Sequence, residues 1–194
     1  VIEGEKHFYR RQEVIDLMNV LRVLDHPHDQ VALAGILRSP LGGLSDRALY
    51  ELRQAMGFDF LRGAGLSTWG HPSAPAVSRL YGHLAWLHRQ VGALPLAEVL
   101  ELIFDRLPIL EIAAASVQGE QAVANLLKVK HTAAAFSDRP HLTLSGFVDL
   151  MVARLDEQPD EAESPLSEES SNAIQVLTIH KAKGLEFPIV VLPG

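Results

Sequence analysis

The sequence predicts a mainly α-helical chain with a few β-strands at its two ends, which would belong to an incomplete α/β domain. Through the middle of the chain, apolar residues recur every three or four positions, as they do on the buried face of a helix. Near the end, residues 173–178 alternate between apolar and polar side chains. Residues 187–192 form a continuous apolar run rich in β-branched residues, which is typical of a strand buried on both faces.

The individual elements follow from this periodicity and from the residues that interrupt it. A short aromatic segment, Glu5–Tyr9, is compatible with a strand. We expect Asp29 and Ser45 to cap the helices that follow them, since both are preferred N-cap residues. Residues 57–75 are rich in Gly, Ser and Pro and predict an extended loop. The expected helices cover residues 11–24, 29–37, 46–56, 77–91, 96–106, 119–136 and 145–155.

Length and composition indicate a soluble globular protein. The 194 residues are 47% hydrophobic and 21% charged, and no window approaches the roughly 18 apolar residues of a membrane span. Because the chain has no cysteine, disulfides and thiolate metal sites are excluded, and a reducing, cytoplasmic location is expected. The chain starts at Val1 and stops after an apolar run, from which we expect it to be a section of a longer protein.

The negative charge of the chain is concentrated in one stretch. The formal net charge is −7, and residues 156–172 hold seven of the 24 acidic residues, so the remaining 17 balance the 17 Lys and Arg. We interpret residues 156–172 as a solvated linker rather than a carboxylate active site. The neutral remainder permits local contacts with phosphates and argues against a broad electrostatic footprint on DNA.

The nine histidines do not predict a metal site. His26 and His28 flank a proline in a predicted turn, which is an ordinary surface position. His83 and His88 are five residues apart on a helix, whereas a helical metal pair is spaced by four.

Polar side chains with distinct chemistry are concentrated in Thr178-Ile-His-Lys-Ala-Lys-Gly-Leu-Glu-Phe187. A preceding strand would deliver Thr178 and His180 to its carboxyl end, where α/β sheets build their sites. Gly184 permits a tight turn, and Glu186 stands just before the next strand. Hydroxyl, imidazole and ammonium groups suit phosphate oxygens, and a carboxylate suits a sugar hydroxyl. On spacing alone, an ordinary polar connection between strands is the alternative.

This run closely resembles motif V of superfamily 1 DNA helicases of the UvrD/Rep/RecB type, which reads T-x-H-x-A-K-G-L-E-F. The resemblance implies that Thr178, His180 and Lys181 contact the phosphates of the tracked single strand. It also implies that Gly184 lies near the nucleotide and that Glu186 accepts a hydrogen bond from the ribose hydroxyl of ATP. One loop would then touch both ligands and couple nucleotide state to the grip on DNA.

Two earlier segments support the same resemblance. Gly4-Glu-Lys-His-Phe-Tyr-Arg-Arg-Gln-Glu-Val-Ile-Asp16 is similar to the strand-to-helix segment that opens the second motor domain of these helicases. Phe8 and Tyr9 would anchor that strand, and Arg11 and Glu13 would lie at the helix start, where a local ion pair is the alternative role.

The second of these segments, Ser39 to Arg53, is similar to the T-P-x-R-G-I-G-D run at the entrance of the helical insertion called 2B. There, a glycine turn that feeds a helix N-terminus meets the backbone of duplex DNA. By this resemblance Gly43, Leu44, Ser45 and Arg47 are candidate contacts to DNA. In this chain Gly42 replaces the arginine and Ser45 replaces the last glycine, so DNA binding and simple helix capping remain equal alternatives.

The resemblance is strongest to the AddA/RecB-like branch and implies a division of the chain. Residues 1–25 would open the second RecA-like (P-loop NTPase) motor domain, residues 26–155 would form a 2B-type insertion, residues 156–172 a linker, and residues 173–194 the motif V strands. The full-length parent would be an ATP-dependent 3′-to-5′ DNA helicase or translocase of recombinational repair, which would use ATP and Mg²⁺. Its partners would be single-stranded DNA, duplex DNA and a second subunit of a helicase-nuclease complex. No contact with a membrane is expected.

The chain lacks the parts of a motor that bind the β- and γ-phosphates. No G-x-x-x-x-G-K-[ST] run occurs in it, and we identify no catalytic residue. We therefore expect the isolated chain to bind no cofactor and to be inactive. The alternative interpretation is a helical regulatory or protein-docking module of the helicase complex without direct DNA contact.

Overall fold

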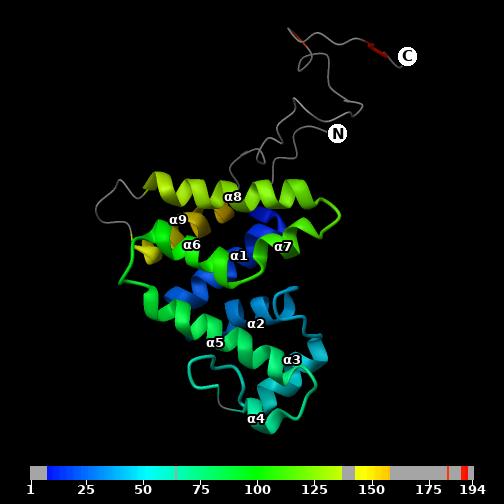
Figure 1. Ribbon diagram of the computed structural model, residues 1–194, viewed down its shortest axis with the longest axis vertical. Coiled ribbons are helices and arrows are strands. Elements are labelled where there is room, and N and C mark those ends of the chain that lie inside the picture. Colours follow the sequence, from blue (N-terminus) through cyan, green and yellow to red (C-terminus); the bar gives the residue numbers. More distant parts are fainter. Residues whose placement is uncertain (1–7, 64, 137–142, 158–182, 184–188, 192–194) are drawn as a thin grey trace.

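The computed structural model describes residues 8–63, 65–136, 143–157, 183 and 189–191. Within these residues the protein contains nine α-helices and one short 3₁₀ turn, and no β-strand (Figure 1). The mainly α class expected from the sequence is therefore confirmed for this part of the chain. The elements are η1 (Phe8–Arg10), α1 (Gln12–Asp25), α2 (Gln30–Arg38), α3 (Asp46–Gln54), α4 (Leu66–Trp69), α5 (Ala74–Gln90), α6 (Leu96–Arg106), α7 (Ile109–Ala114), α8 (Gly119–Phe136) and α9 (Leu144–Glu157).

Helix α1 is the centre of the helical body. It packs against α2, α5, α8, α9 and η1, so neighbours cover it on several sides (Figure 1). Half of its 14 residues are buried, and they are not confined to one stripe, as is usual for a helix surrounded by others. These residues are Val14, Leu17, Met18, Val20, Leu21, Val23 and Leu24. The helix that the sequence assigned to the opening of a motor domain thus shares its core with the helices that follow.

The remaining helices form two groups around α1. In Figure 1, α6, α7, α8 and α9 occupy the upper half, where α8 packs against α6 and α7. Helices α2 to α5 form the lower half, in which α2 packs on α3 and α4 packs on α5. Helix α5 connects the halves because it contacts both α1 and α6.

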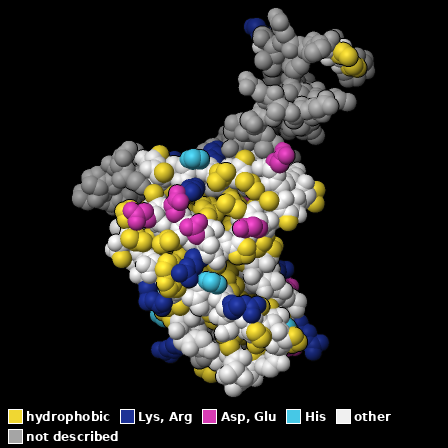
Figure 2. Space-filling view, viewed as in Figure 1, with side chains coloured by type: hydrophobic (Ala, Val, Ile, Leu, Met, Phe, Trp, Pro, Cys, Tyr) yellow, Lys and Arg dark blue, Asp and Glu magenta, His cyan; other side chains and the backbone are white. Residues whose placement is uncertain are grey.

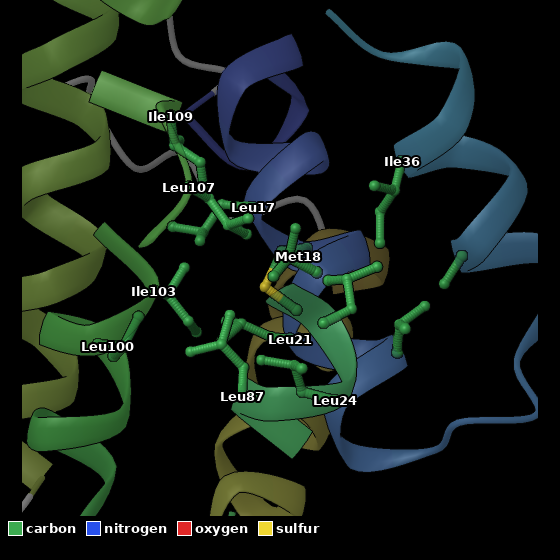
Figure 3. Close-up of a cluster of buried hydrophobic side chains, with 14 of the residues drawn as sticks. Leu17, Met18, Leu21, Leu24, Ile36, Leu87, Leu100, Ile103, Leu107 and Ile109 are labelled. Atoms are coloured by element: carbon green, nitrogen blue, oxygen red, sulfur yellow. The ribbon is translucent and has the colours of Figure 1, made fainter. Parts of the chain in front are cut away.

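One continuous hydrophobic core runs through both groups. Figure 3 shows where they meet: Leu21 and Leu24 of α1 point toward Leu87 of α5, with Leu100 and Ile103 of α6 beside them. All five of these side chains are completely buried. Burial of a leucine or isoleucine side chain stabilises a fold by roughly 1.5–3 kcal/mol, so this junction holds the two groups together as one body.

The two expected N-caps are confirmed. The Asp29 carboxylate accepts a hydrogen bond from the Ala32 amide at 2.9 Å, and it also pairs with Arg22 at 2.7 Å. The Ser45 hydroxyl accepts from the Ala48 amide at 3.3 Å.

Several local expectations need correction. Phe8 and Tyr9 belong to the 3₁₀ turn rather than to a strand. The expected loop 57–75 contains the short helix α4, and α7 follows Pro108, where no helix was expected. The first two residues of the expected linker, Asp156 and Glu157, belong to α9. The remainder of that segment, residues 158–172, lies outside the described residues.

The β-strands expected near the end of the chain fall almost entirely outside the described residues. Residues 173–178 are not among them. Of the run 187–192, only Ile189–Val191 are described; they form no strand and are exposed.

Candidate nucleic-acid interface

The residues of the motif V resemblance lie outside the described part of the chain. This applies to Thr178, His180, Lys181, Gly184 and Glu186, so their roles stay predictions. The one described residue of this run is Lys183, whose side chain is exposed.

The candidate DNA-contacting turn between α2 and α3 is held by its own backbone. The Ser39 carbonyl accepts hydrogen bonds from the amides of Gly42 (3.0 Å) and Gly43 (2.8 Å), and the Leu37 carbonyl accepts from the Leu44 amide at 2.9 Å. The buried Ser39 hydroxyl donates to the Ile36 carbonyl at 2.8 Å. The amides of Gly42, Gly43 and Leu44 are therefore already occupied.

The two glycines of this turn are required for different reasons. A Cβ atom on Gly42 would lie 2.4 Å from both the Cα and the carbonyl oxygen of Leu37, so no larger residue fits without moving backbone. Gly43 has nothing within 4 Å of such an atom, but its φ of +63° lies in the left-handed region that side chains disfavour. An arginine at position 42, as in the similar helicase run, would collide with the Leu37 backbone. This steric conflict explains why the chain has glycine there instead.

The start of α3 presents backbone amides beside an exposed arginine. Ser45 caps the Ala48 amide, whereas the amides of Asp46 and Arg47 have no acceptor among the described residues. Leu44 has only 4% of its surface exposed, so any contact it makes outside the fold would involve its backbone. Amides at a helix start favour an anion, and capping by Ser45 leaves two of them available.

Charges around this turn are mostly balanced in pairs. The Arg47 guanidinium lies 2.9 Å from the Glu51 carboxylate, and that of Arg38 lies 3.0 Å from the Asp46 carboxylate. Residues 26–91 include six arginines, no lysine and four acidic residues, which leaves only a small positive excess. On the face drawn in Figure 2, acidic side chains gather over the upper half and basic ones over the middle and lower half. With so small a positive excess, this surface can bind a few phosphates but not a long tract of DNA.

The opening segment joins α8 through a polar contact that the sequence did not predict. Glu13 accepts a hydrogen bond at 2.8 Å from Asn125, which is completely buried. The Arg11 guanidinium donates to the side-chain oxygen of Gln118 at 3.4 Å. The sequence signal that could have indicated this contact is Asn125, which stands among apolar residues on α8. A buried amide side chain needs a hydrogen-bond partner.

The described residues contain no group of three or more His, Asp or Glu side chains that could hold a metal ion. Among these residues, no helix is both long and apolar enough to cross a membrane.

The chain is similar to a helicase domain family and to a group of helicase/nuclease subunits. Residues 131–194 match the family described as "UvrD-like helicase C-terminal domain". Proteins named as the A subunit of an ATP-dependent helicase/nuclease are similar over nearly the whole chain. The protein of Lactobacillus delbrueckii subsp. bulgaricus is 29% identical over 97% of this chain, that of Latilactobacillus sakei subsp. sakei 29% over 99%, and that of Oenococcus oeni 30% over 96%.

The chain spans only a part of these relatives, 16% of the first and third and 23% of the second. The resemblance expected from the sequence is thus confirmed: the last third of the chain matches the UvrD-like helicase C-terminal domain, and the chain as a whole is distantly homologous to part of the helicase/nuclease A subunits.

Proposed function

We propose that the chain is a section of an ATP-dependent 3′-to-5′ DNA helicase or translocase of recombinational repair. The observation that carries the proposal is the run Thr178 to Phe187, which lies within the region that matches the UvrD-like helicase C-terminal domain. The names of the relatives, which describe an ATP-dependent helicase/nuclease, support the same activity for the full-length protein. Because the chain lacks a P-loop, it would work only as part of a larger motor that supplies ATP and Mg²⁺ sites.

Within this motor, the chain would contribute two functional parts. Residues 26–155 would be a 2B-type insertion, and residues 173–194 would be the strands and loop of motif V, joined by the acidic segment 156–172. Helix α1 would connect residues 1–25 of the motor domain to the insertion by way of their common core.

The motif V loop would couple the nucleotide to the single strand. Thr178, His180 and Lys181 would hold phosphates, while Gly184 and Glu186 would lie at the nucleotide. The test is Glu186→Ala in the full-length protein, with Glu51→Ala as a control on the exposed side of α3. We expect Glu186→Ala to raise the KM for ATP and Glu51→Ala to leave it unchanged. Unchanged ATP kinetics in Glu186→Ala would remove the ribose assignment.

The turn before α3 would meet duplex DNA through its helix N-terminus. Support comes from the amides of Asp46 and Arg47, which have no acceptor in the described residues, and from the exposed Arg47 guanidinium. Fluorescence anisotropy with a single-strand/duplex junction oligonucleotide tests this contact. We expect binding that weakens with salt, and Arg47→Ala to reduce the slope of log K against log salt by about one.

A matched control for Arg47 is Arg79→Ala, an exposed arginine on α5. If both variants lower DNA affinity equally, the contact at the turn is nonspecific. Absence of any binding at low salt favours the second candidate function, a helical docking module. That candidate is favoured by one observation: the charges at the turn are largely balanced by Glu51 and Asp46.

The name of the relatives designates one subunit of a helicase/nuclease, which suggests that the full-length protein also assembles with a second subunit. We include this partner in the proposal.

A further inference from the structure

Helices α2 and α3 form an antiparallel pair that is linked at both ends by polar side chains. At one end, Arg38 near the end of α2 pairs with Asp46 at the start of α3, with 3.0 Å between Nε and Oδ1. At the other end, the Arg53 guanidinium near the end of α3 donates to the side-chain oxygen of Gln30 at the start of α2. The two links therefore bound the outer surface of the pair at its two ends.

This face carries large apolar side chains that the fold leaves uncovered. Tyr50 is 65% exposed; it lies four residues after Asp46 and three before Arg53, which places it on the linked side of α3. Val31, next to Gln30 on α2, is 76% exposed, and Met56, just beyond α3, is 80% exposed. We call Val31, Tyr50, Arg53 and Met56 the α2–α3 face.

Met56 has a strained backbone. Its φ is +58°, and it is the one non-glycine residue with positive φ in the described part of the chain. The Met56 amide donates to the Arg53 carbonyl at 3.0 Å and the Gly57 amide to the Leu52 carbonyl at 2.9 Å, which is the helix-ending geometry that usually has glycine at this position. Since the Met56 side chain is exposed, the fold gains no burial in return for the strain. A strained residue whose side chain contributes nothing to the core is a reason to look for a function of that side chain outside the fold.

Arg53 is the cation of this face that lacks a carboxylate partner among the described residues. Arg38 and Arg47 are paired with Asp46 and Glu51, whereas Arg53 donates to an amide oxygen and lies over the Phe58 ring, 5.9 Å from its centroid. Its guanidinium retains donors for a carboxylate.

Charge and composition together decide the kind of ligand. A nucleic acid or an anionic membrane needs several uncompensated cations, and the face offers one. Tyrosine, methionine and arginine are the residues enriched in the cores of protein interfaces, and methionine adapts its shape to a partner. The fitting occupant is a protein segment with apolar side chains around one carboxylate.

We infer that the α2–α3 face docks a segment of the second subunit of this assembly, with apolar side chains against Val31, Tyr50 and Met56 and a carboxylate on Arg53. The inference rests on the proposed function, from which the second subunit is taken. It divides α3 between two ligands: its N-terminal end faces DNA, and its C-terminal end faces protein.

The experiment uses the full-length protein and its purified second subunit. The affinity between them is measured for wild type, Tyr50→Ala, Met56→Gly and Arg53→Gln. Val117→Ala is the matched control, because Val117 is a fully exposed apolar residue between α7 and α8. We expect Tyr50→Ala and Met56→Gly each to raise the Kd about 10- to 100-fold and Val117→Ala to leave it unchanged.

Met56→Gly also separates docking from folding. Glycine relieves the positive φ, so Tm should not fall while the affinity for the second subunit does. Wild-type Kd values for the second subunit in both Tyr50→Ala and Met56→Gly overturn the inference. Loss of DNA affinity with intact binding of the second subunit would assign the face to nucleic acid, and loss of self-association would assign it to a second copy of the chain; both outcomes also overturn it.

The proposed function is judged separately in the same preparations. Wild-type protein without DNA-stimulated ATP hydrolysis contradicts the helicase proposal, whatever its affinity for the second subunit. Variants that lose the second subunit but keep wild-type ATP hydrolysis on single-stranded DNA support the docking inference alone.

Discussion

The neighbouring glycines of the turn before α3 should respond in opposite ways to added side chains. Gly42→Ala would place a Cβ atom 2.4 Å from the Leu37 backbone, about 1 Å inside ordinary van der Waals contact. Relief requires moving the carbonyl that accepts the Leu44 amide hydrogen bond, which is 2.9 Å long. Gly43 is surrounded by open space, and its φ of +63° is one that asparagine tolerates.

The magnitude follows from these contacts. Overpacking against fixed backbone costs about 1–3 kcal/mol, and weakening one hydrogen bond adds about 1 kcal/mol, so Gly42→Ala should lower the free energy of unfolding by roughly 2–4 kcal/mol. Gly43→Asn should cost less than about 1 kcal/mol, because it meets no steric obstacle. For a chain of this size, the expected drop in Tm is about 4–16 °C for Gly42→Ala and under about 4 °C for Gly43→Asn.

Urea unfolding followed by circular dichroism in the far ultraviolet measures both variants, with the wild-type slope as the check on two-state behaviour. Gly42→Arg, which restores the arginine of the similar helicase run, should be at least as destabilised as Gly42→Ala. Equal stability of Gly42→Ala and Gly43→Asn would refute the steric reasoning. A stable Gly42→Arg variant with tighter DNA binding would show that the turn accommodates the helicase pattern.

Substitutions at three further positions test the caps and the buried polar contact. Ser45→Ala should destabilise α3 by about 1 kcal/mol in urea unfolding, with Ser45→Gly costing only a few tenths; equal costs would mean that the hydroxyl cap contributes nothing. Burial raises the pKa of Asp29, but the Ala32 amide and Arg22 outweigh it, so the pKa lies below its usual value. Its stabilising contribution is therefore present above about pH 4 and lost as pH falls through the lowered pKa, and the stability gap between wild type and Asp29→Asn should shrink between about pH 7 and about pH 3. Asn125→Ala removes the donor to Glu13 and should cost about 1–3 kcal/mol in thermal or urea unfolding; a cost near zero would mean that water replaces the amide.

The helical body could be predicted from the sequence because its signals are local. The periodicity from Val14 to Leu24 defines α1, and the bounds of α8 agree with the expected 119–136. The caps at Asp29 and Ser45 involve residues only three positions apart, so they do not depend on the remainder of the fold.

The errors have physical causes that local patterns do not capture. Phe8 and Tyr9 are both buried; an alternating strand would turn them to opposite faces, whereas a 3₁₀ turn lets both reach the core. Pro108 was interpreted as an interruption, but it precedes α7, because proline is well tolerated at the start of a helix.

The candidate site could be predicted only in part. The turn at Gly43 was identified from its similarity to a known run. The sequence did not predict that the amides of this turn are hydrogen-bonded within the protein, because those bonds depend on how the chain folds back on Leu37 and Ser39. The proposed α2–α3 face was not identified, because the exposure of Val31, Tyr50 and Met56 depends on how the helices pack and cannot be inferred from the sequence.

The central position of α1 has a consequence for how this body opens. Its side chains are shared among α2, α5, α8 and α9, so α1 cannot unfold without uncovering both halves. Its amide protons should therefore exchange with deuterium only through global unfolding, at rates that report the full stability of the chain. The short helix α4, which packs on α3 and α5, should exchange by local opening, so a binding partner that slowed α1 exchange would be stabilising the whole body rather than one helix.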